Sequence, residues 1–328
     1  MVIGKLKIEN SKLAVSKVES LKIAVLAGGI GEEREISIES GDCVSQALKE
    51  AGLNVVTVEV RPDKLDILED DSIDVFFIAL HGKFGEDGQL QQILEDKSLV
   101  YTGSGPAANR LAFDKMASKK AFTKAGIDTP LAVKFDTDVD IRRLEKRLEE
   151  FTDKYVVKPI RQGSSVGISI VSGVSEAIAA AKKCLGEFGD CMIEEFIPGR
   201  EVTVSILAGR PLPIIEIRPK ENFYNYHAKY IDEQTEFLFD TINEPELTAK
   251  INAAALDCFG ALGCRDFGRV DFILGGDQAA YVLEVNTIPG FTPHSLLPKA
   301  AARVGFSMSD LYTKIIELAY SSLVARSS

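Results

Sequence analysis

Two almost wholly apolar segments near the start of the chain constrain the fold most strongly. LKIAVLAGG occupies residues 21–29 and DVFFIAL occupies residues 74–80. Between them lie a helix-like segment, EISIESGDCVSQALKEAG, and a strand-like one, NVVTVEV. Strands that are apolar along their whole length are typical of parallel sheets covered on both faces. The strand–helix–strand order therefore predicts a Rossmann-like α/β domain over residues 21–103.

The remainder of the chain mixes strands and helices in a different order, which predicts two α+β domains, at residues 104–198 and 199–328. The first contains the helices DIRRLEKRLEEF and SEAIAAAKKCLGEF and the strands YVVKP, ISIVSG and MIEEFI. The second contains the strands EVTVSILAG and PIIEI, the helix ELTAKINAAALDCFGALG, a hairpin and the helix MSDLYTKIIELAYSSL. Residues 1–20 form an N-terminal extension, either a disordered arm or a short strand.

The composition narrows the class of protein. The chain has 328 residues, of which 45% are hydrophobic, as in an ordinary globular protein. Its net charge of −11 argues against nucleic acid as a partner. The five cysteines form no C-x-x-C pair, so we expect reduced thiols in a cytoplasmic protein. Residues 1–20 lack the apolar core of a secretory signal, and no run of about 18 apolar residues predicts a membrane span.

The hairpin RVDFILGGDQAAYVLEVNTIPG, residues 269–290, carries an unusual set of polar residues. Glu284 and Asn286 lie two apart on one strand, so they point to the same face. Antiparallel pairing across the turn could bring Asp271 beside them. Two adjacent carboxylates repel unless a cation neutralises them, and an all-oxygen ligand set suits Mg²⁺. A solvated polar face on an edge hairpin is the alternative.

Two glycine-rich segments are candidates for phosphate binding. KPIRQGSSVG, residues 158–167, places a lysine at a strand end before small residues that let backbone N–H groups approach phosphates. It is not a P-loop, and a flexible hairpin loop is the alternative. GSGPAA, residues 103–108, matches the G-x-G-x-x-A pattern, but Lys124 and Gly126 occupy the region of the expected ribose-binding acid. Dinucleotide binding is therefore disfavoured.

Other polar residues follow strands of the first domain, at the edge where ligands bind in open α/β sheets. His81 lies in ALHGKFGEDG and Glu33 in GGIGEEREIS. The alternatives are a loop histidine without a role and a simple acidic helix start. In NFYNYHAKYID, Lys229 could belong to a lid over phosphates, or the aromatic residues could form a buried cluster.

Together these segments resemble one family, the D-alanine–D-alanine ligases of the ATP-grasp superfamily. The matching elements cover about residues 21–325 in the family's order: GGIGEEREISIESG, ALHGKFGEDGQLQ, YTGSG, DKMASK, VVKPIRQGSSVGIS, IEEFIPGREVTVSIL, YHAKY, GRVDF and LEVNTIPGFTPHSLLPKAA. The resemblance implies an ATP-grasp fold. In this fold the Rossmann-like N-terminal domain is followed along the chain by central and C-terminal α+β domains, which sandwich ATP. It also implies a homodimer.

The resemblance implies roles for the candidate residues. Two Mg²⁺ ions, for which Mn²⁺ can substitute, would be held by Asp271, Glu284 and Asn286, with Glu284 bridging them. The expected ATP-binding residues are Lys115 and Lys158 at the phosphates, Ser165 and Val166 in the loop above them, Glu194 at the adenine amino group, the backbone of Glu195, Phe196 and Ile197 around the ring, and Glu201 at the ribose.

The same resemblance assigns the amino-acid subsites. Glu33 and His81 would hold the first D-alanine, and Ser295 and Leu296 the carboxylate of the second. The expected catalytic residues are Glu33, Ser164 and Tyr230, which form the link that closes the lid, Lys229 within the lid, and Arg269 with the Gly290 N–H, which stabilise the tetrahedral oxyanion.

The implied reaction is the ATP-dependent joining of two D-alanines through an acyl phosphate, for peptidoglycan precursor synthesis. The sequence departs from the family pattern at His227, Gln162 and Ile160. A lid histidine at position 227 could make the choice of second substrate depend on pH. Tyr230 favours a dipeptide over an ester. The rival hypotheses are a ligase with another acceptor, such as D-lactate or D-serine, a non-catalytic nucleotide-binding regulator, and a dinucleotide-dependent oxidoreductase.

Overall fold

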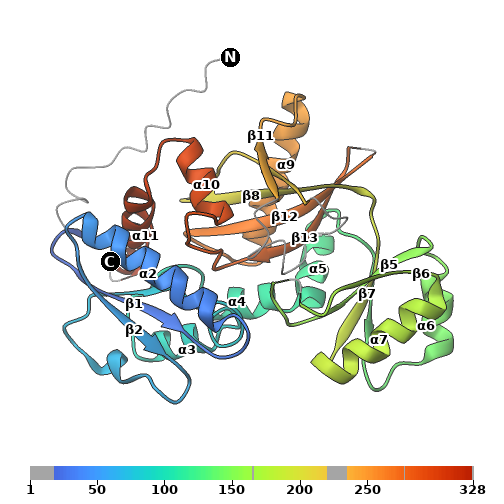
Figure 1. The fold of residues 1–328 in the computed structure, drawn as a ribbon, viewed down its shortest axis with the longest axis horizontal. Coiled ribbons are helices and arrows are strands. Elements are labelled where there is room, and N and C mark those ends of the chain that lie inside the picture. Colours follow the sequence, from blue (N-terminus) through green and yellow to red (C-terminus); the bar gives the residue numbers. More distant parts are fainter. Residues whose placement is uncertain (1–17, 165, 220–234, 277, 327–328) are drawn as a thin grey trace.

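The computed structural model describes residues 18–164, 166–219, 235–276 and 278–326. Within these ranges the strands form three sheets, which lie side by side in Figure 1. The calls on Ser165, His227, Lys229, Tyr230 and the N-terminal extension up to residue 17 lie outside the described residues.

The first sheet is parallel, as predicted, with the order β2-β1-β3. Its strands are β1 (Lys22–Gly28), β2 (Asn54–Val60) and β3 (Val75–Ile78), joined by α2 (Arg34–Glu50) and the 3-10 helix η1 (Asp66–Glu69). Strand β3 is buried along its whole length, and β1 at all but its first residue, because elements cover both faces. A Cβ on Gly41 would lie 2.5 Å from the Ala27 Cβ, so this glycine lets α2 pack directly on β1.

Three helices then lead away from the first sheet: α3 (Gln89–Asp96), α4 (Pro106–Phe113) and α5 (Lys115–Lys124). Pro106 occupies the first turn of α4, where its missing N–H costs no hydrogen bond. Asp114 separates α4 from α5 and caps α5 by accepting a 3.0 Å hydrogen bond from the Ala117 N–H. This cap fixes the start of the helix that carries Lys115.

The central sheet is antiparallel with the order β4-β7-β5-β6. It consists of β4 (Ala132–Phe135), β5 (Lys154–Pro159), β6 (Ser169–Ser172) and β7 (Cys191–Glu195). The helices α6 (Ile141–Leu148) and α7 (Val174–Phe188) cover one face, at the right of Figure 1. Asp140 caps α6 through the N–H groups of Arg142 and Arg143, and Leu144 and Leu148 on its apolar face are buried, as the helical spacing predicts.

The third sheet has the order β11-β10-β8-β12-β13, with β9 paired to β8. Its strands are β8 (Gly199–Leu207), β9 (Arg210–Pro211), β10 (Ile215–Arg218), β11 (Glu236–Phe239), β12 (Phe267–Gly275) and β13 (Ala280–Asn286). The helices of this region are α9 (Pro245–Ala261), α10 (Leu296–Arg303) and α11 (Met308–Arg326). In Figure 1, α11 lies beside α2, at the other end of the chain.

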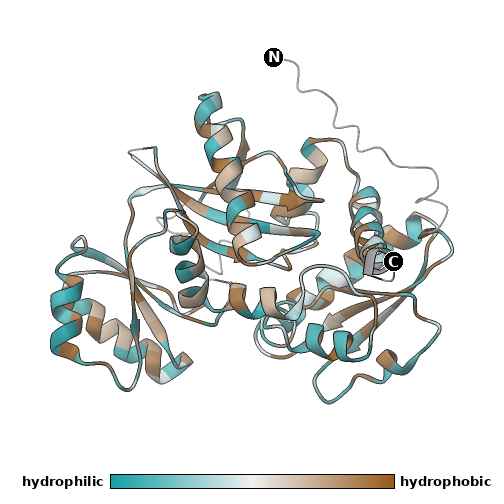
Figure 2. Cartoon of the chain, turned by 180° about the vertical axis from the view of Figure 1, so that it is seen from behind, coloured by the Kyte–Doolittle hydropathy of each residue, from teal (hydrophilic) through white to brown (hydrophobic). Residues whose placement is uncertain are grey.

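The apolar residues form three clusters. One joins the first sheet to α10, α11 and residues of the third sheet such as Phe267. A second lies between the third sheet and α9 and includes Phe122 of α5. The third belongs entirely to the central sheet and its two helices. Figure 2 shows this distribution, with apolar colour along the strands and polar colour on the outer helix faces. The domain boundaries at residues 103 and 198 stay a prediction.

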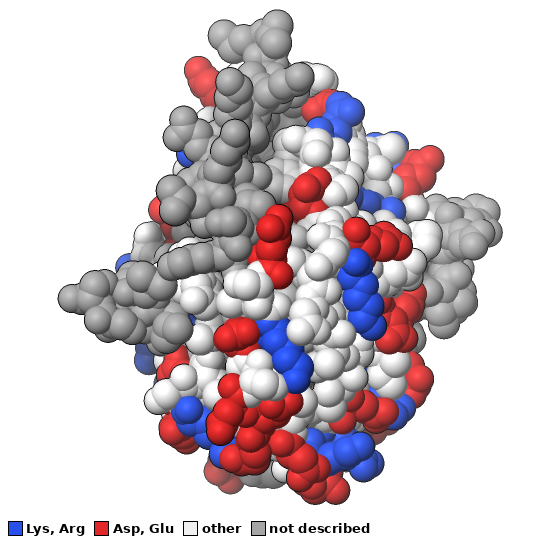
Figure 3. Space-filling view, turned by 90° about the vertical axis from the view of Figure 1, so that its left-hand side faces the viewer, with Lys and Arg blue, Asp and Glu red and all other residues white. Residues whose placement is uncertain are grey.

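Within the described ranges, no helix combines the length and apolar character needed to cross a membrane. All five cysteines carry free thiols. On the face drawn in Figure 3, the Lys and Arg side chains of the described residues are interspersed with Asp and Glu rather than gathered into one basic patch.

Candidate active site

The antiparallel hairpin of β12 and β13 brings its polar residues together. Asp271 pairs with Glu284, and Arg269 pairs with Asn286. The Asn286 amide donates to Asp271 Oδ2 at 2.9 Å. A register irregularity between Asp271 and Phe272 marks a bulge next to this cluster. Bulges re-aim side chains near active sites, and here the bulge directly follows the clustered carboxylate.

Positive charge lies against both carboxylates of the hairpin. Arg269 donates from Nε to Asp271 Oδ1 and from Nη2 to Oδ2, each at 2.8 Å. Thr203 of the neighbouring strand β8 adds a 2.6 Å hydrogen bond to Oδ1. Lys115 Nζ lies 3.1 Å from Glu284 Oε2. Asp271 is only 5% exposed, so the alternative of a solvated polar face is wrong for this residue.

The chemistry of these donors suits a hard cation. Two carboxylates and one amide offer oxygen ligands only, which hard cations such as Mg²⁺ prefer. In this structure Arg269 balances the negative charge of Asp271, and Lys115 balances that of Glu284. The donor set therefore fits Mg²⁺.

A pocket of about 420 Å³ lies between the central and third sheets. Val156, Ile170, Phe196 and Leu283 give it apolar walls. Predicted nucleotide and metal residues line it as well: Lys115, Lys158, Val166, Glu194, Glu195, Phe196, Ile197, Glu201, Asp271 and Glu284. A small adjoining hollow shares Lys115, Gly163 and Glu284 with this pocket and reaches Asn286. An apolar slot with charged groups at its edge is the usual form of a nucleotide site.

Glu194 lies at the wall of this pocket in a buried ionic group. Its side chain contacts Lys158 Nζ at 2.6 Å and Lys119 Nζ at 2.5 Å. Burial alone would raise the pKa of Glu194, but the charges of the two lysines outweigh it and hold the pKa below its usual value. Burial lowers the pKa of Lys119 to about 8, against the opposing effect of Glu194. The carboxylate is therefore ionised at neutral pH.

Glu33, which follows β1, reaches the glycine-rich loop of the central region. Ser164 of that loop donates a hydrogen bond to Glu33 Oε1. A Cβ on Gly163 would lie 2.8 Å from both carboxylate oxygens, and one on Gly82 would lie 2.3 Å from Oε2. A side chain at either position would have to displace the Glu33 carboxylate, which lies between the loop after β3 and the glycine-rich loop.

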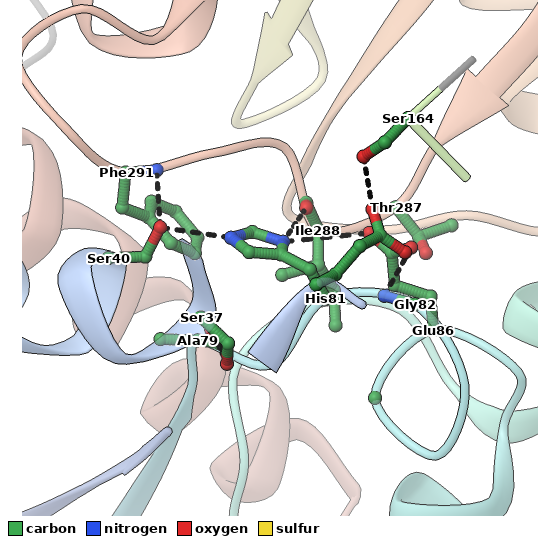
Figure 4. Close-up of polar contacts among 12 residues, drawn as sticks. Ser37, Ser40, Ala79, His81, Gly82, Glu86, Ser164, Thr287, Ile288 and Phe291 are labelled. Atoms are coloured by element: carbon green, nitrogen blue, oxygen red, sulfur yellow. Dashed lines mark hydrogen bonds and ion pairs between the residues drawn. The ribbon is translucent and has the colours of Figure 1, made fainter. Parts of the chain in front are cut away.

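His81, which follows β3, is 6% exposed and held from both ring nitrogens (Figure 4). Nδ1 lies 3.1 Å from the Ile288 carbonyl oxygen, and Nε2 lies 2.9 Å from Ser40 Oγ. Since a carbonyl only accepts, Nδ1 carries a proton. Ser40 also accepts from the Phe291 N–H at 3.5 Å. The ring thus joins α2 to the segment after β13.

The segment after β13 contains the remaining predicted substrate residues. Ser295 Oγ lies 3.1 Å from Thr292 N and 2.9 Å from Thr292 Oγ1. A Cβ on Gly290 would lie 2.6 Å from Ser295 Oγ, so these two residues are in close contact. The Leu296 side chain packs in the first apolar cluster, which leaves its backbone N–H, at the start of α10, as the group that could meet a carboxylate.

Three residues that contact this site were not predicted from the sequence. Lys119 lies four positions after Lys115, so both project from one side of α5, and that spacing was the available signal. Thr203 lies opposite Asp271 in the register of β8 and β12, which no local pattern reveals. Ser40 contacts His81 from a neighbouring element, and only the fold shows that contact.

Known proteins resemble the chain over most of its length. The family model described as "D-ala D-ala ligase C-terminus" matches residues 123–317, and the one described as "D-ala D-ala ligase N-terminus" matches residues 64–104. A D-alanine–D-alanine ligase of Syntrophotalea carbinolica is 44% identical, over 92% of this chain and 96% of that protein.

Solved structures show the same fold. The D-alanine–D-alanine ligase of Bacillus anthracis complexed with ATP has a TM-score of 0.82 and 33% identity, over 94% of this chain and all of that one. The VanG D-Ala:D-Ser ligase of Enterococcus faecalis has a TM-score of 0.79 and 28% identity, over 91% of this chain and 99% of that one. The architecture is thus common to ligases with different second substrates.

Proposed function

The chain belongs to the D-alanine–D-alanine ligase family, and on that basis we propose how its residues perform the reaction. The reaction is the ATP-dependent joining of two D-alanines to D-alanyl-D-alanine, with release of ADP and phosphate, for peptidoglycan synthesis. This excludes the dinucleotide-dependent oxidoreductase. We also propose that the enzyme acts in the cytoplasm. We further propose that it is a homodimer, and sedimentation in solution would test that oligomeric state.

ATP occupies the pocket between the central and third sheets. Val156, Phe196 and Leu283 provide apolar surface for the base, and Glu194 accepts from the adenine amino group. Glu201 lies at the wall where the ribose hydroxyls would be bound. Lys115 and Lys158 neutralise the phosphates, and Val166 lines the same pocket. Ser165, expected in the loop above the phosphates, lies outside the described residues.

Asp271, Glu284 and Asn286 would hold Mg²⁺, with Mn²⁺ as a substitute. The bound cations would neutralise charge that builds up on the transferred phosphoryl group. Arg269 and Lys115 now contact two of these carboxylates, so both cationic side chains lie within reach of the reacting groups. The proposed cation ligands and the proposed oxyanion-stabilising arginine thus belong to two neighbouring pairs of the hairpin, Arg269 with Asn286 and Asp271 with Glu284.

The first D-alanine lies between Glu33 and His81. Glu33 attracts its ammonium group, and His81 orients its carboxylate toward the γ-phosphate. Attack of that carboxylate on the phosphorus gives an acyl phosphate and ADP. Because Glu33 also accepts from Ser164, occupation of this subsite is coupled to the position of the glycine-rich loop. A closed loop keeps water from the acyl phosphate.

The second D-alanine binds through its carboxylate to Ser295 and the Leu296 N–H. Its deprotonated amine attacks the acyl carbon, and the tetrahedral oxyanion is stabilised by Arg269 and the Gly290 N–H. Collapse of this intermediate expels phosphate and forms the peptide bond. Lys229 and Tyr230, outside the described residues, complete the lid as the family pattern implies.

The contact between Glu284 and Lys115 carries this proposal, because it brings the predicted cation ligands and a phosphate lysine into one pocket. The test measures phosphate release by the purified protein with Mg²⁺-ATP and D-alanine, and the product's mass. We expect D-alanyl-D-alanine in an amount equal to the phosphate, none with L-alanine, and loss of turnover in Glu284→Gln.

The same assay separates the remaining rival hypotheses. Product formed only when D-lactate or D-serine accompanies D-alanine would move the function to another acceptor. ATP binding without turnover of any pair would favour the non-catalytic regulator.

A further inference from the structure

Glu194 has two cationic partners where one would balance its charge. The carboxylate is 1% exposed, and it contacts Lys119 Nζ and Lys158 Nζ at 2.5 and 2.6 Å. Lys158 lines the nucleotide pocket, and Lys119 is not among the residues that line it. The two lysines are therefore not equivalent with respect to a bound nucleotide.

Lys119 is fixed in place on the far side of Glu194. Its side chain is 6% exposed and donates to Thr129 Oγ1 at 2.7 Å and to the Pro130 carbonyl at 2.9 Å. Thr129 in turn donates to the Val282 carbonyl at 2.8 Å, and Val282 N–H donates to the Asp128 carbonyl at 2.9 Å. Lys119 is thus tied to a segment that is itself anchored on β13.

Binding of ATP would change the balance around Glu194. The phosphates carry several negative charges and attract Lys158, which borders the same pocket. If Lys158 turned toward them with no other cation present, Glu194 would be left as a buried charge without a partner. Such a charge is strongly unfavourable, so Glu194 would hold Lys158 back or take up a proton.

We propose that Lys119 is a positioning residue for nucleotide recognition, which keeps Glu194 ionised and oriented toward the adenine amino group when Lys158 turns to the phosphates. This role rests on the proposed binding of ATP in this pocket. Lysine side chains are seldom buried, and an apolar residue would suit this interior position better. The positioning role explains why a lysine is found there. Near neutral pH Lys119 remains mostly protonated, as the role requires.

The test is direct binding of a non-hydrolysable ATP analogue, measured by calorimetry without D-alanine. Lys119→Met should weaken binding about 30-fold or more, as expected when one partner of a buried charge pair is lost. Lys119→Arg should recover most of the affinity. Lys120→Met, which changes an exposed lysine on the same helix, is the matched control and should bind like the wild type.

Two comparisons separate positioning from general packing. The wild type should bind an analogue without the 6-amino group more weakly than it binds the adenine analogue. Lys119→Met should bind the two analogues almost equally. In a Glu194→Gln background, Lys119→Met should change affinity by less than about threefold, because the neutral amide needs no cation.

Additive losses in the double variant, or unchanged base discrimination in Lys119→Met, would overturn the proposal. Thermal melting of each variant checks folding. If Lys119→Met alone fails to fold, two comparisons of ATP-analogue affinity still test the proposal. They are the double variant against Glu194→Gln, and Lys119→Arg against the wild type. A wild-type protein that binds the analogue but joins no D-alanines refutes the proposed ligase function while leaving this test valid.

Discussion

Ser164→Ala isolates the link between the first domain and the glycine-rich loop. The substitution removes the hydroxyl that donates to the buried Glu33 carboxylate and leaves the backbone of the loop unchanged. Ser164 has a φ of 53°, and alanine meets the same backbone strain there as serine. The change therefore tests the hydrogen bond rather than the loop conformation.

The size of the effect follows from the charge and burial of Glu33. The carboxylate is 8% exposed and confined between Gly82 and Gly163, so water has little room to replace the lost donor. A hydrogen bond to a charged group contributes about 1.5–3 kcal/mol. At about 1.4 kcal/mol per tenfold change, kcat/KM for D-alanine should fall about 10- to 150-fold.

Nucleotide binding should be spared, since Ser164 is not among the residues that line the nucleotide pocket. The assay compares kcat/KM for D-alanine with the dissociation constant of a non-hydrolysable ATP analogue. Ser169→Ala, at an exposed position on β6, serves as the control. An equal loss in both quantities, or no loss in kcat/KM, would refute the coupling of the D-alanine subsite to the loop.

Three further results are expected. Gly290→Ala places a Cβ 2.6 Å from Ser295 Oγ, so D-alanine saturation curves should show weaker binding of the second substrate, by about tenfold, with ATP affinity unchanged. Thr203→Val removes the 2.6 Å hydrogen bond to Asp271; the Mg²⁺ concentration for half-maximal turnover should rise about tenfold, as for a lost ligand-orienting group. Lys119 has a pKa near 8 and is charged below it, so affinity for the ATP analogue should fall as the pH rises through 8, and Lys119→Arg should abolish that fall, measured by calorimetry from pH 7 to 9.

The sequence predicts the elements whose signals are local. The apolar strands β1 and β3 form the expected parallel sheet, because burial on both faces requires their composition. Antiparallel pairing of the hairpin could be anticipated from its short turn, but its exact register could not. Pairing of Phe272 with Val282 would set Asp271 opposite Leu283, and the bulge between Asp271 and Phe272 shifts it opposite Glu284. The nucleotide residues were expected from the family resemblance rather than from spacing, and those within the described part of the chain line one pocket.

The contacts that the sequence did not reveal all depend on distant segments. The local sequence around Lys119 does not distinguish it from other helix lysines. Its partner Glu194 belongs to β7, and only the tertiary fold brings the two side chains into contact. Ser40 gains its partner only because β3 ends beside α2. The packing of α11 on α2 joins opposite ends of the chain, and neither helix pattern specifies its partner. Such pairings arise from tertiary packing, which periodicity does not encode.

The separate apolar core of the central sheet has a consequence for how the enzyme opens. The first sheet shares its apolar core with α10 and α11, whereas the apolar cluster of the central sheet, among the described residues, is shared with α6 and α7. Regions with independent cores open and close as separate cooperative units, each with its own free energy. Amide hydrogens of the central sheet would therefore exchange with solvent as one group, without exposing those around His81. If the subsites are as proposed, the central-sheet wall of the nucleotide pocket would loosen to release ADP while the residues around His81 stay in place.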